Sequence, residues 1–118
     1  MNTYAGFAFS LQMKTTKVAL FKVTTIESNP ENWELIKNSI PVFNKGHIAT
    51  IKAIKTRFYV DLSIPETPPS ITLNADDIIY VIQVKGLARL VDRKEYTNEE
   101  IANASFSIEK VEVLEAEN

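Results

Sequence analysis

His47 is the side chain whose type and position best suit chemistry in this sequence. It directly follows Gly46, at a point where a helix is expected to begin. The first N–H groups of a helix have no intrahelical partner and lie at the positive end of its dipole, so an anion such as phosphate can bind there. The dipole lowers the pKa of an imidazole and a bound phosphate raises it, so His47 could donate a proton to a leaving oxygen near neutral pH. The alternative is a histidine that packs against the sheet without a ligand.

Other reactive groups are absent or lack a recognisable setting. The chain has no cysteine and a single histidine, which excludes thiol nucleophiles, thiolate metal sites, disulfides and multi-histidine metal sites. Its three glycines, Gly6, Gly46 and Gly86, are spread too widely to form a phosphate-binding loop. No nucleophile-elbow pattern surrounds any serine. We therefore expect neither a metal nor a cofactor.

Charge is distributed unevenly along the chain. The 13 basic and 15 acidic residues give a net charge of −2, which argues against a protein that binds duplex nucleic acid by its charge. Residues 45–57 carry basic side chains and no acidic one, and residues 85–94 carry several more against Asp92 alone. Acidic residues gather instead in 27–34 and 109–117. The basic segments could focus a small anionic ligand, or they could be ordinary solvated faces.

Apolar periodicity and capping signals predict the elements that would position His47. Residues 3–13 and 18–26 have the pattern of strands, with a turn at 14–16 between them. A helix is expected from SNPE at 28–31, because Ser or Asn can cap it and Pro30 fits its first turn, and it should stop before Pro41. A second helix is expected from Gly46, since apolar residues recur there at helical spacing: Ile48, Ile51, Ile54 and Phe58.

The second half of the chain is expected to form mainly strands. Three prolines make 63–70 a loop, and residues 70–73 and 78–84 predict a hairpin around a turn at 74–77. Residues 87–90 are a candidate continuation of the second strand. Thr97 and Glu100 have the spacing of a capping box, so a helical turn should begin there. Residues 105–113 are expected to close the domain as a strand, and 114–118 to form a frayed acidic end.

Together these elements predict one domain of the α+β class over residues 1–118. It should hold a mixed, mostly antiparallel sheet flanked by two main helices, with strands at both termini. The longest purely apolar run, 78–82, is too short to span a membrane, and no signal peptide is recognisable. We therefore expect no membrane association and a cytoplasmic location.

Several short motifs occur in an order that resembles one known family. They are AFSLQM at 8–13, GHIATI at 46–51, VIQ at 81–83, RLVD at 89–92, TNEEI at 97–101 and FSI at 106–108. Their order and spacing, over nearly the whole chain, resemble the viral ring nucleases, the type III anti-CRISPR proteins of archaeal viruses and phages. The resemblance implies a homodimer, or a higher homo-oligomer, that binds a cyclic oligoadenylate across the subunit interface.

The chemistry implied by the resemblance is metal-independent cleavage of a phosphodiester. A ribose 2′-hydroxyl attacks its own phosphodiester, a histidine protonates the departing 5′-oxygen, and the product carries a 2′,3′-cyclic phosphate. By match to the family motifs, His47 would be the catalytic general acid. Four residues would bind the ligand: Ser10, Gln83, Arg89, which would counter phosphate charge, and Asp92, which stands in place of a family glutamate.

The sequence departs from the family at positions that would touch the ligand. Phe7 replaces an asparagine, Pro68 aligns with an arginine, Asp92 is shorter than glutamate, and residues 86–88 displace Arg89. Three functions follow. The protein removes a cyclic nucleotide signal by His47-assisted cleavage, or it sequesters a cyclic nucleotide or a cyclic ADP-ribose-like signal without turnover. In the third, it blocks a host protein through its sheet edge or the 65–69 loop and needs no ligand.

Overall fold

The chain folds as a single α+β domain in the computed structural model, which describes residues 1–9, 12–13, 16–67 and 71–117. Within these residues, six strands form one mixed sheet in the order β2-β3-β6-β5-β1-β4. The pairs from β2 to β5 are antiparallel, whereas β1 pairs in parallel with β5 and β4. The strands are β1 (Thr3–Gly6), β2 (Gln12–Met13), β3 (Thr16–Ile26), β4 (Ile40–Pro41), β5 (Ile78–Lys85) and β6 (Ser105–Glu117).

Local hydrogen bonds explain where the helices begin. Asn29 caps α1 (Pro30–Lys37) by accepting from the Asn32 N–H at 2.8 Å, and Pro30 occupies the first turn as predicted. Thr97 and Glu100 form the predicted capping box of α3 (Asn98–Asn103). The second predicted helix starts slightly later than expected. A short 3₁₀ turn, η1 (Lys45–His47), precedes α2 (Ile48–Phe58), so His47 stands at the junction of turn and helix.

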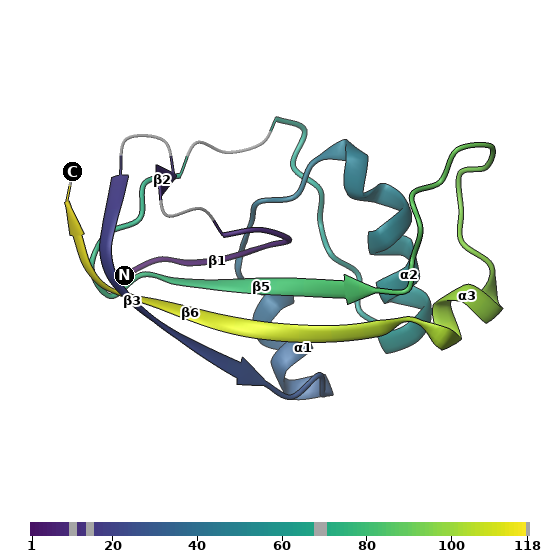
Figure 1. Ribbon diagram of the computed structural model, residues 1–118, viewed down its shortest axis with the longest axis horizontal. Coiled ribbons are helices and arrows are strands. Elements are labelled where there is room, and N and C mark those ends of the chain that lie inside the picture. The colour runs from purple at the N-terminus through teal and green to yellow at the C-terminus, as the bar shows by residue number, and fades with distance from the viewer. Residues whose placement is uncertain (10–11, 14–15, 68–70, 118) are drawn as a thin grey trace.

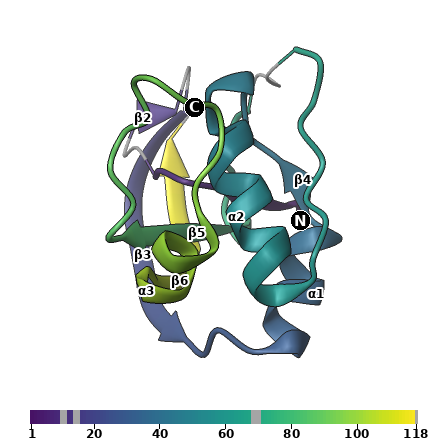
Figure 2. The ribbon, with the colours of Figure 1, turned by 90° about the vertical axis from the view of Figure 1, so that its right-hand side faces the viewer.

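The sheet carries an apolar core on each face. The three helices lie together on one side of it (Figure 2), where Trp33, Ile54 and Ile108 are among the buried residues. The other face holds a second cluster that includes Leu73 and Val113. β5 and β6 run side by side through the middle of the sheet (Figure 1) and contribute to both clusters, because successive side chains of a strand point to opposite faces.

Two strand predictions were wrong, each for a different physical reason. Residues 71–73 have no regular structure, and no hairpin forms with β5. Ile71 and Leu73 are buried against the second core cluster while the residue between them is exposed, which imitates the period of a strand. Residues 87–90 are not a strand either, since Gly86 has a φ of +91° and turns the chain away from β5.

The two ends of the chain differ from expectation as well. The first strand stops at Gly6 instead of continuing to residue 13, and β2 is a separate short strand. The C-terminal strand, in contrast, continues to Glu117 where a frayed end was expected. β3 is long enough to pair with it over this stretch, with Val18 opposite Ala116 and Leu20 opposite Glu115. Ladder hydrogen bonds across the pair therefore order an acidic segment whose composition is typical of an unstructured end.

Among the described residues, no helix combines the length and apolar character needed to cross a membrane.

Candidate functional site

The candidate site lies where the parallel strands end. β4, β1 and β5 run in the same direction, so their carboxyl ends share one edge of the domain. β1 pairs with β5 only as far as the Gly6–Val81 register, whereas β5 continues to Lys85. The chain leaving β4 reaches η1 and the start of α2 close by. A crevice outside the carboxyl ends of parallel strands, beside a helix N-terminus, is where α/β sheets commonly bind ligands.

A pocket of about 490 Å³ occupies this crevice. One wall comes from Phe7, which follows β1, and from the turn and helix that follow β4. The other wall is the end of β5 and the residue that follows Gly86. Its lining residues are Phe7, His47, Thr50, Ile82, Gln83, Val84, Lys85 and Leu87. The predicted residues His47 and Gln83 therefore meet in one pocket, although they are far apart in the sequence.

His47 is half-buried and held on two sides. Its ring lies 4.6 Å from the Phe7 ring, centroid to centroid. Its Nδ1 atom accepts a hydrogen bond from the backbone N–H of Asn44 at 3.3 Å. Burial lowers the pKa of His47 below its ordinary value, so the imidazole is neutral at pH 7. No described carboxylate forms an ion pair with it.

The polar lining of the pocket suits an anion. Lys85 is its charged lining residue, and Thr50 and Gln83 add a hydroxyl and an amide. Gln83 Nε2 also donates to the carboxylate of Glu109, which lies on the neighbouring strand β6 and outside the lining of this pocket. A second hollow of about 360 Å³, lined mainly by apolar residues, adjoins the first and shares Phe7 and Gln83 with it. The two hollows together provide apolar and hydrogen-bonding surface on both sides of Gln83.

The structure does not place the other predicted site residues in this pocket. Ser10 and Pro68 lie outside the described residues. Arg89 and Asp92 are exposed in the segment between β5 and α3, and neither is part of the pocket lining. Residues 86–88 displace Arg89 in the sequence. They begin at Gly86, whose positive φ turns the chain away from β5. Of the four predicted site residues that lie in the described part of the chain, His47 and Gln83 line this pocket together, whereas Arg89 and Asp92 do not.

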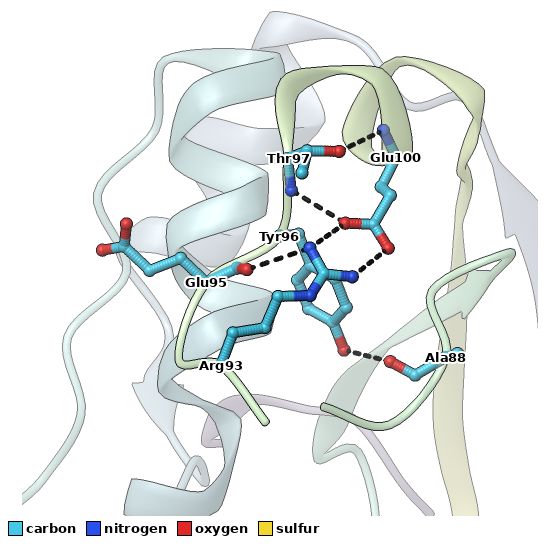
Figure 3. A network of polar contacts seen from close by, with 6 residues as sticks. All are labelled: Ala88, Arg93, Glu95, Tyr96, Thr97 and Glu100. Atoms are coloured by element: carbon cyan, nitrogen blue, oxygen red, sulfur yellow. Dashed lines mark hydrogen bonds and ion pairs between the residues drawn. The ribbon is translucent and has the colours of Figure 1, made fainter. Parts of the chain in front are cut away.

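A network of polar contacts fixes the segment that carries Arg89 and Asp92 (Figure 3). The guanidinium of Arg93 binds both carboxylate oxygens of Glu100, at 2.5 and 2.6 Å. The Tyr96 hydroxyl donates to the Ala88 carbonyl at 2.9 Å, which closes the segment on itself. The hydrogen bonds from Arg93, followed by that from the Thr97 N–H, lower the pKa of Glu100 to about 2. The segment is therefore tied to the start of α3 at neutral pH.

Sequence reasoning missed two polar lining residues, Lys85 and Thr50. In both cases the spacing in the sequence could have indicated the residue. Lys85 lies two residues after Gln83, and alternate residues of a strand share a face. Thr50 lies three residues after His47, and this spacing places side chains near one another on a helix. By sequence, Phe7 indicates only the loss of a ligand-binding asparagine, whereas in the structure its ring packs on His47.

The fold and pocket define a small α+β protein with a ligand-sized crevice at the ends of its parallel strands. No family model matches the sequence, and no curated protein matches it either. The fold is similar to that of B116 of Sulfolobus turreted icosahedral virus (STIV), with a TM-score of 0.63 and 18% sequence identity. The similarity covers 94% of this chain and 98% of that chain. At this identity it establishes a shared fold, which is that of a viral protein.

Proposed function

We propose that this chain is a viral anti-defence protein that binds a cyclic nucleotide signal of its host cell in the His47 pocket. The observation that carries the proposal is the meeting of His47, Gln83 and Lys85 in one crevice beside the start of α2. These side chains supply imidazole, amide and ammonium donors, which are suited to phosphate oxygens. The fold shared with B116, a viral protein, supports the viral part of the proposal.

The pocket dimensions and walls favour a nucleotide over a bare anion. Its volume of about 490 Å³ falls within the range of about 300–1,000 Å³ that is usual for small-molecule sites. Phe7 and Leu87 offer apolar surface for a base, and Lys85 offers charge for a phosphate. A ring of several nucleotides is larger than one such pocket. We therefore propose a homodimer, in which a two-fold axis places two copies of the pocket against one ring.

Two fates of the bound signal are compatible with these residues. In the cleavage route, the ribose 2′-hydroxyl loses its proton to water as its oxygen attacks phosphorus, the bond from phosphorus to the 5′-oxygen breaks, and His47 gives its proton to that 5′-oxygen. The route needs a protonated imidazole, but burial lowers the pKa of His47. The neutral side chain can still donate a hydrogen bond to a phosphate oxygen. The site thus supports capture of the ligand at neutral pH, and cleavage should gain speed as the pH falls.

The test is to mix the purified protein, in EDTA, with cyclic oligoadenylates, cyclic di- and trinucleotides and cyclic ADP-ribose isomers. Free ligand and products are then followed by chromatography, before and after heat denaturation. We would compare the wild type with His47→Ala, with Lys85→Ala and with Lys37→Ala. Lys37, an exposed lysine in the last turn of α1, is the matched control, because it removes the same charge outside the pocket.

Each outcome identifies one function. Linear products with 2′,3′-cyclic phosphate ends, absent with His47→Ala, would establish cleavage. Depletion of free ligand, followed by recovery of the intact ligand on heating, would establish capture. In both cases Lys85→Ala should weaken binding by about tenfold or more, the effect of losing one charged hydrogen bond, whereas Lys37→Ala should not. If no ligand is depleted, the proposal fails, and inhibition through a protein surface becomes the working hypothesis.

A further inference from the structure

The turn before His47 is built like a helix cap, but with a histidine in the closing position. The Asn44 side chain accepts a hydrogen bond from the Gly46 N–H at 2.8 Å. In return, His47 Nδ1 accepts from the Asn44 N–H at 3.3 Å. In the usual capping box a Glu or Gln side chain makes this second bond. Here an imidazole makes this second bond. A neutral imidazole has two ring nitrogens, and only one of them carries a proton.

The bond to Nδ1 determines where the proton of His47 resides. A nitrogen that accepts a hydrogen bond carries no proton, so the proton of the neutral ring must be on Nε2. We propose that the Asn44–His47 turn fixes His47 in its Nε2–H form, with Asn44 as the positioning residue, and that His47 therefore meets the ligand as a hydrogen-bond donor. The link to the ligand rests on the proposed function, whereas the fixed tautomer does not.

The packing around the turn supports a fixed ring. Phe7 contacts the His47 ring at 4.6 Å, which leaves the imidazole less room to turn over. At Gly46, a Cβ atom would lie 3.0 Å from the Asn44 side-chain oxygen, so the glycine lets this oxygen approach the backbone. Asn44 is itself in an extended conformation, as an N-cap residue should be. Three contacts therefore hold the turn closed: the Gly46 N–H bonds to the Asn44 side chain, the Asn44 N–H bonds to His47 Nδ1, and the Phe7 ring packs on His47. His47 takes part in two of them.

The charged groups near His47 do not favour its protonated form. Lys85 lines the pocket from β5, and Lys45 lies in the same turn. The other lining residues of the pocket, among them Thr50 from α2 and Phe7 after β1, carry no charge. Protonation of Nδ1 would also break the bond from the Asn44 N–H and so open the turn. Use of His47 as a general acid thus works against the local structure, whereas its use as a neutral donor does not.

The tautomer can be read directly by NMR on the free protein. His47 is the single histidine of the chain, so long-range ¹H–¹⁵N correlation of a ¹⁵N-labelled sample contains one imidazole, and His47→Gln provides the blank. At pH 7.5 we expect a single Nε2–H ring. Asn44→Ala keeps the backbone N–H that binds Nδ1 but removes the side-chain oxygen that holds the turn closed on Gly46, so we expect the turn to open and the ring to become exchange-averaged, with its titration midpoint shifted upward toward the ordinary histidine value. Asn44→Ser keeps a capping oxygen without adding charge and should restore the wild-type spectrum.

Controls separate this role from a general loss of structure. Thr97→Ala removes the side-chain cap of α3 and should leave the His47 spectrum unchanged. Circular dichroism would show whether each variant is folded. A ring protonated on Nδ1 in the wild type at pH 7.5, or an unchanged spectrum in folded Asn44→Ala, would overturn the inference. Because no ligand is present, this result is independent of the test of cyclic nucleotide binding.

Discussion

Arg57 links the ends of two helices, and its replacement tests how much that link stabilises the domain. It lies in the last turn of α2, and its Nη1 donates to the carbonyls of Ile101 and Ala104 at 2.8 and 3.0 Å. A longer contact of 3.3 Å reaches Ala102. The guanidinium also lies 5.6 Å from the ring centres of two phenylalanines, Phe58 and Phe106. The Ile101 carbonyl also accepts from the Ala104 N–H at 3.3 Å, so the arginine adds a second, shorter hydrogen bond there and a partner for the Ala104 carbonyl at the end of α3.

The magnitude follows from these contacts. Nη1 has two hydrogen atoms, so the two shorter bonds count fully, at about 1 kcal/mol each once partial exposure is allowed for. The two aromatic contacts add about 0.5 kcal/mol at an exposed site. We therefore expect Arg57→Met, which keeps the length of the side chain, to lower the free energy of unfolding by about 2.5 kcal/mol. For a chain of this size the loss corresponds to roughly 8–10 °C in Tm.

Urea unfolding followed by circular dichroism would measure this loss, with Arg57→Lys as the matched variant. Lysine keeps the charge but cannot reproduce the planar arrangement of donors, so it should recover less than half of the loss. The prediction concerns stability alone, because Arg57 is not part of the pocket lining. A loss below about 0.5 kcal/mol in Arg57→Met, the range of an ordinary surface change, would refute the reasoning. A lysine variant as stable as the wild type would refute it too.

Three further changes test other features of the fold. Tyr59 ends α2 in the left-handed region with φ 58° and its side chain is 90% exposed, so Tyr59→Gly should raise the free energy of unfolding by about 0.5–1 kcal/mol in the same urea assay. Gly86→Ala should lower the free energy of unfolding by about 1–2 kcal/mol, since an L residue is strained at φ 91°, while its Cβ would be in ordinary contact with Ala104 at 3.4 Å. The Glu100 carboxylate has its pKa lowered to about 2, so its stabilising bond to Arg93 is complete above about pH 4.5 and is lost as the pH falls toward 2. NMR shifts of residues 86–97 should follow that titration, and Glu100→Gln should abolish it.

The helix starts could be predicted from the sequence because their signals are local. Asn29 with Pro30, and Thr97 with Glu100, make their contacts within a few residues, and the structure confirms both caps. The α+β class and the mostly antiparallel sheet are confirmed as well. These features depend on propensity and on hydrogen bonds between near neighbours, which a single sequence contains.

Strand pairing could not be predicted with the same success. Residues 71–73 alternate because two side chains are buried under the sheet, and Gly86 ends β5 through its conformation. The acidic C-terminal segment is ordered because β3 is long enough to pair with it. For residues 71–73 and for the C-terminal segment, the deciding partner lies far away in the sequence, whereas Gly86 acts through its own backbone conformation. An alternating pattern therefore identifies a half-buried segment, but it does not show with which part of the chain that segment packs or pairs.

The candidate site, too, was predictable from the sequence only in part. The sequence by itself identified His47 at a helix start and Gln83 in a buried strand, because residue type and local pattern single them out. Only the tertiary structure decided that β1 stops at Gly6 while β5 runs on to Lys85, which opens the pocket between them. It also decided that Arg89 lies outside that pocket and that Asn44 holds the ring of His47. The physical reason is that chemistry resides in single side chains, whereas a pocket depends on how distant segments pack.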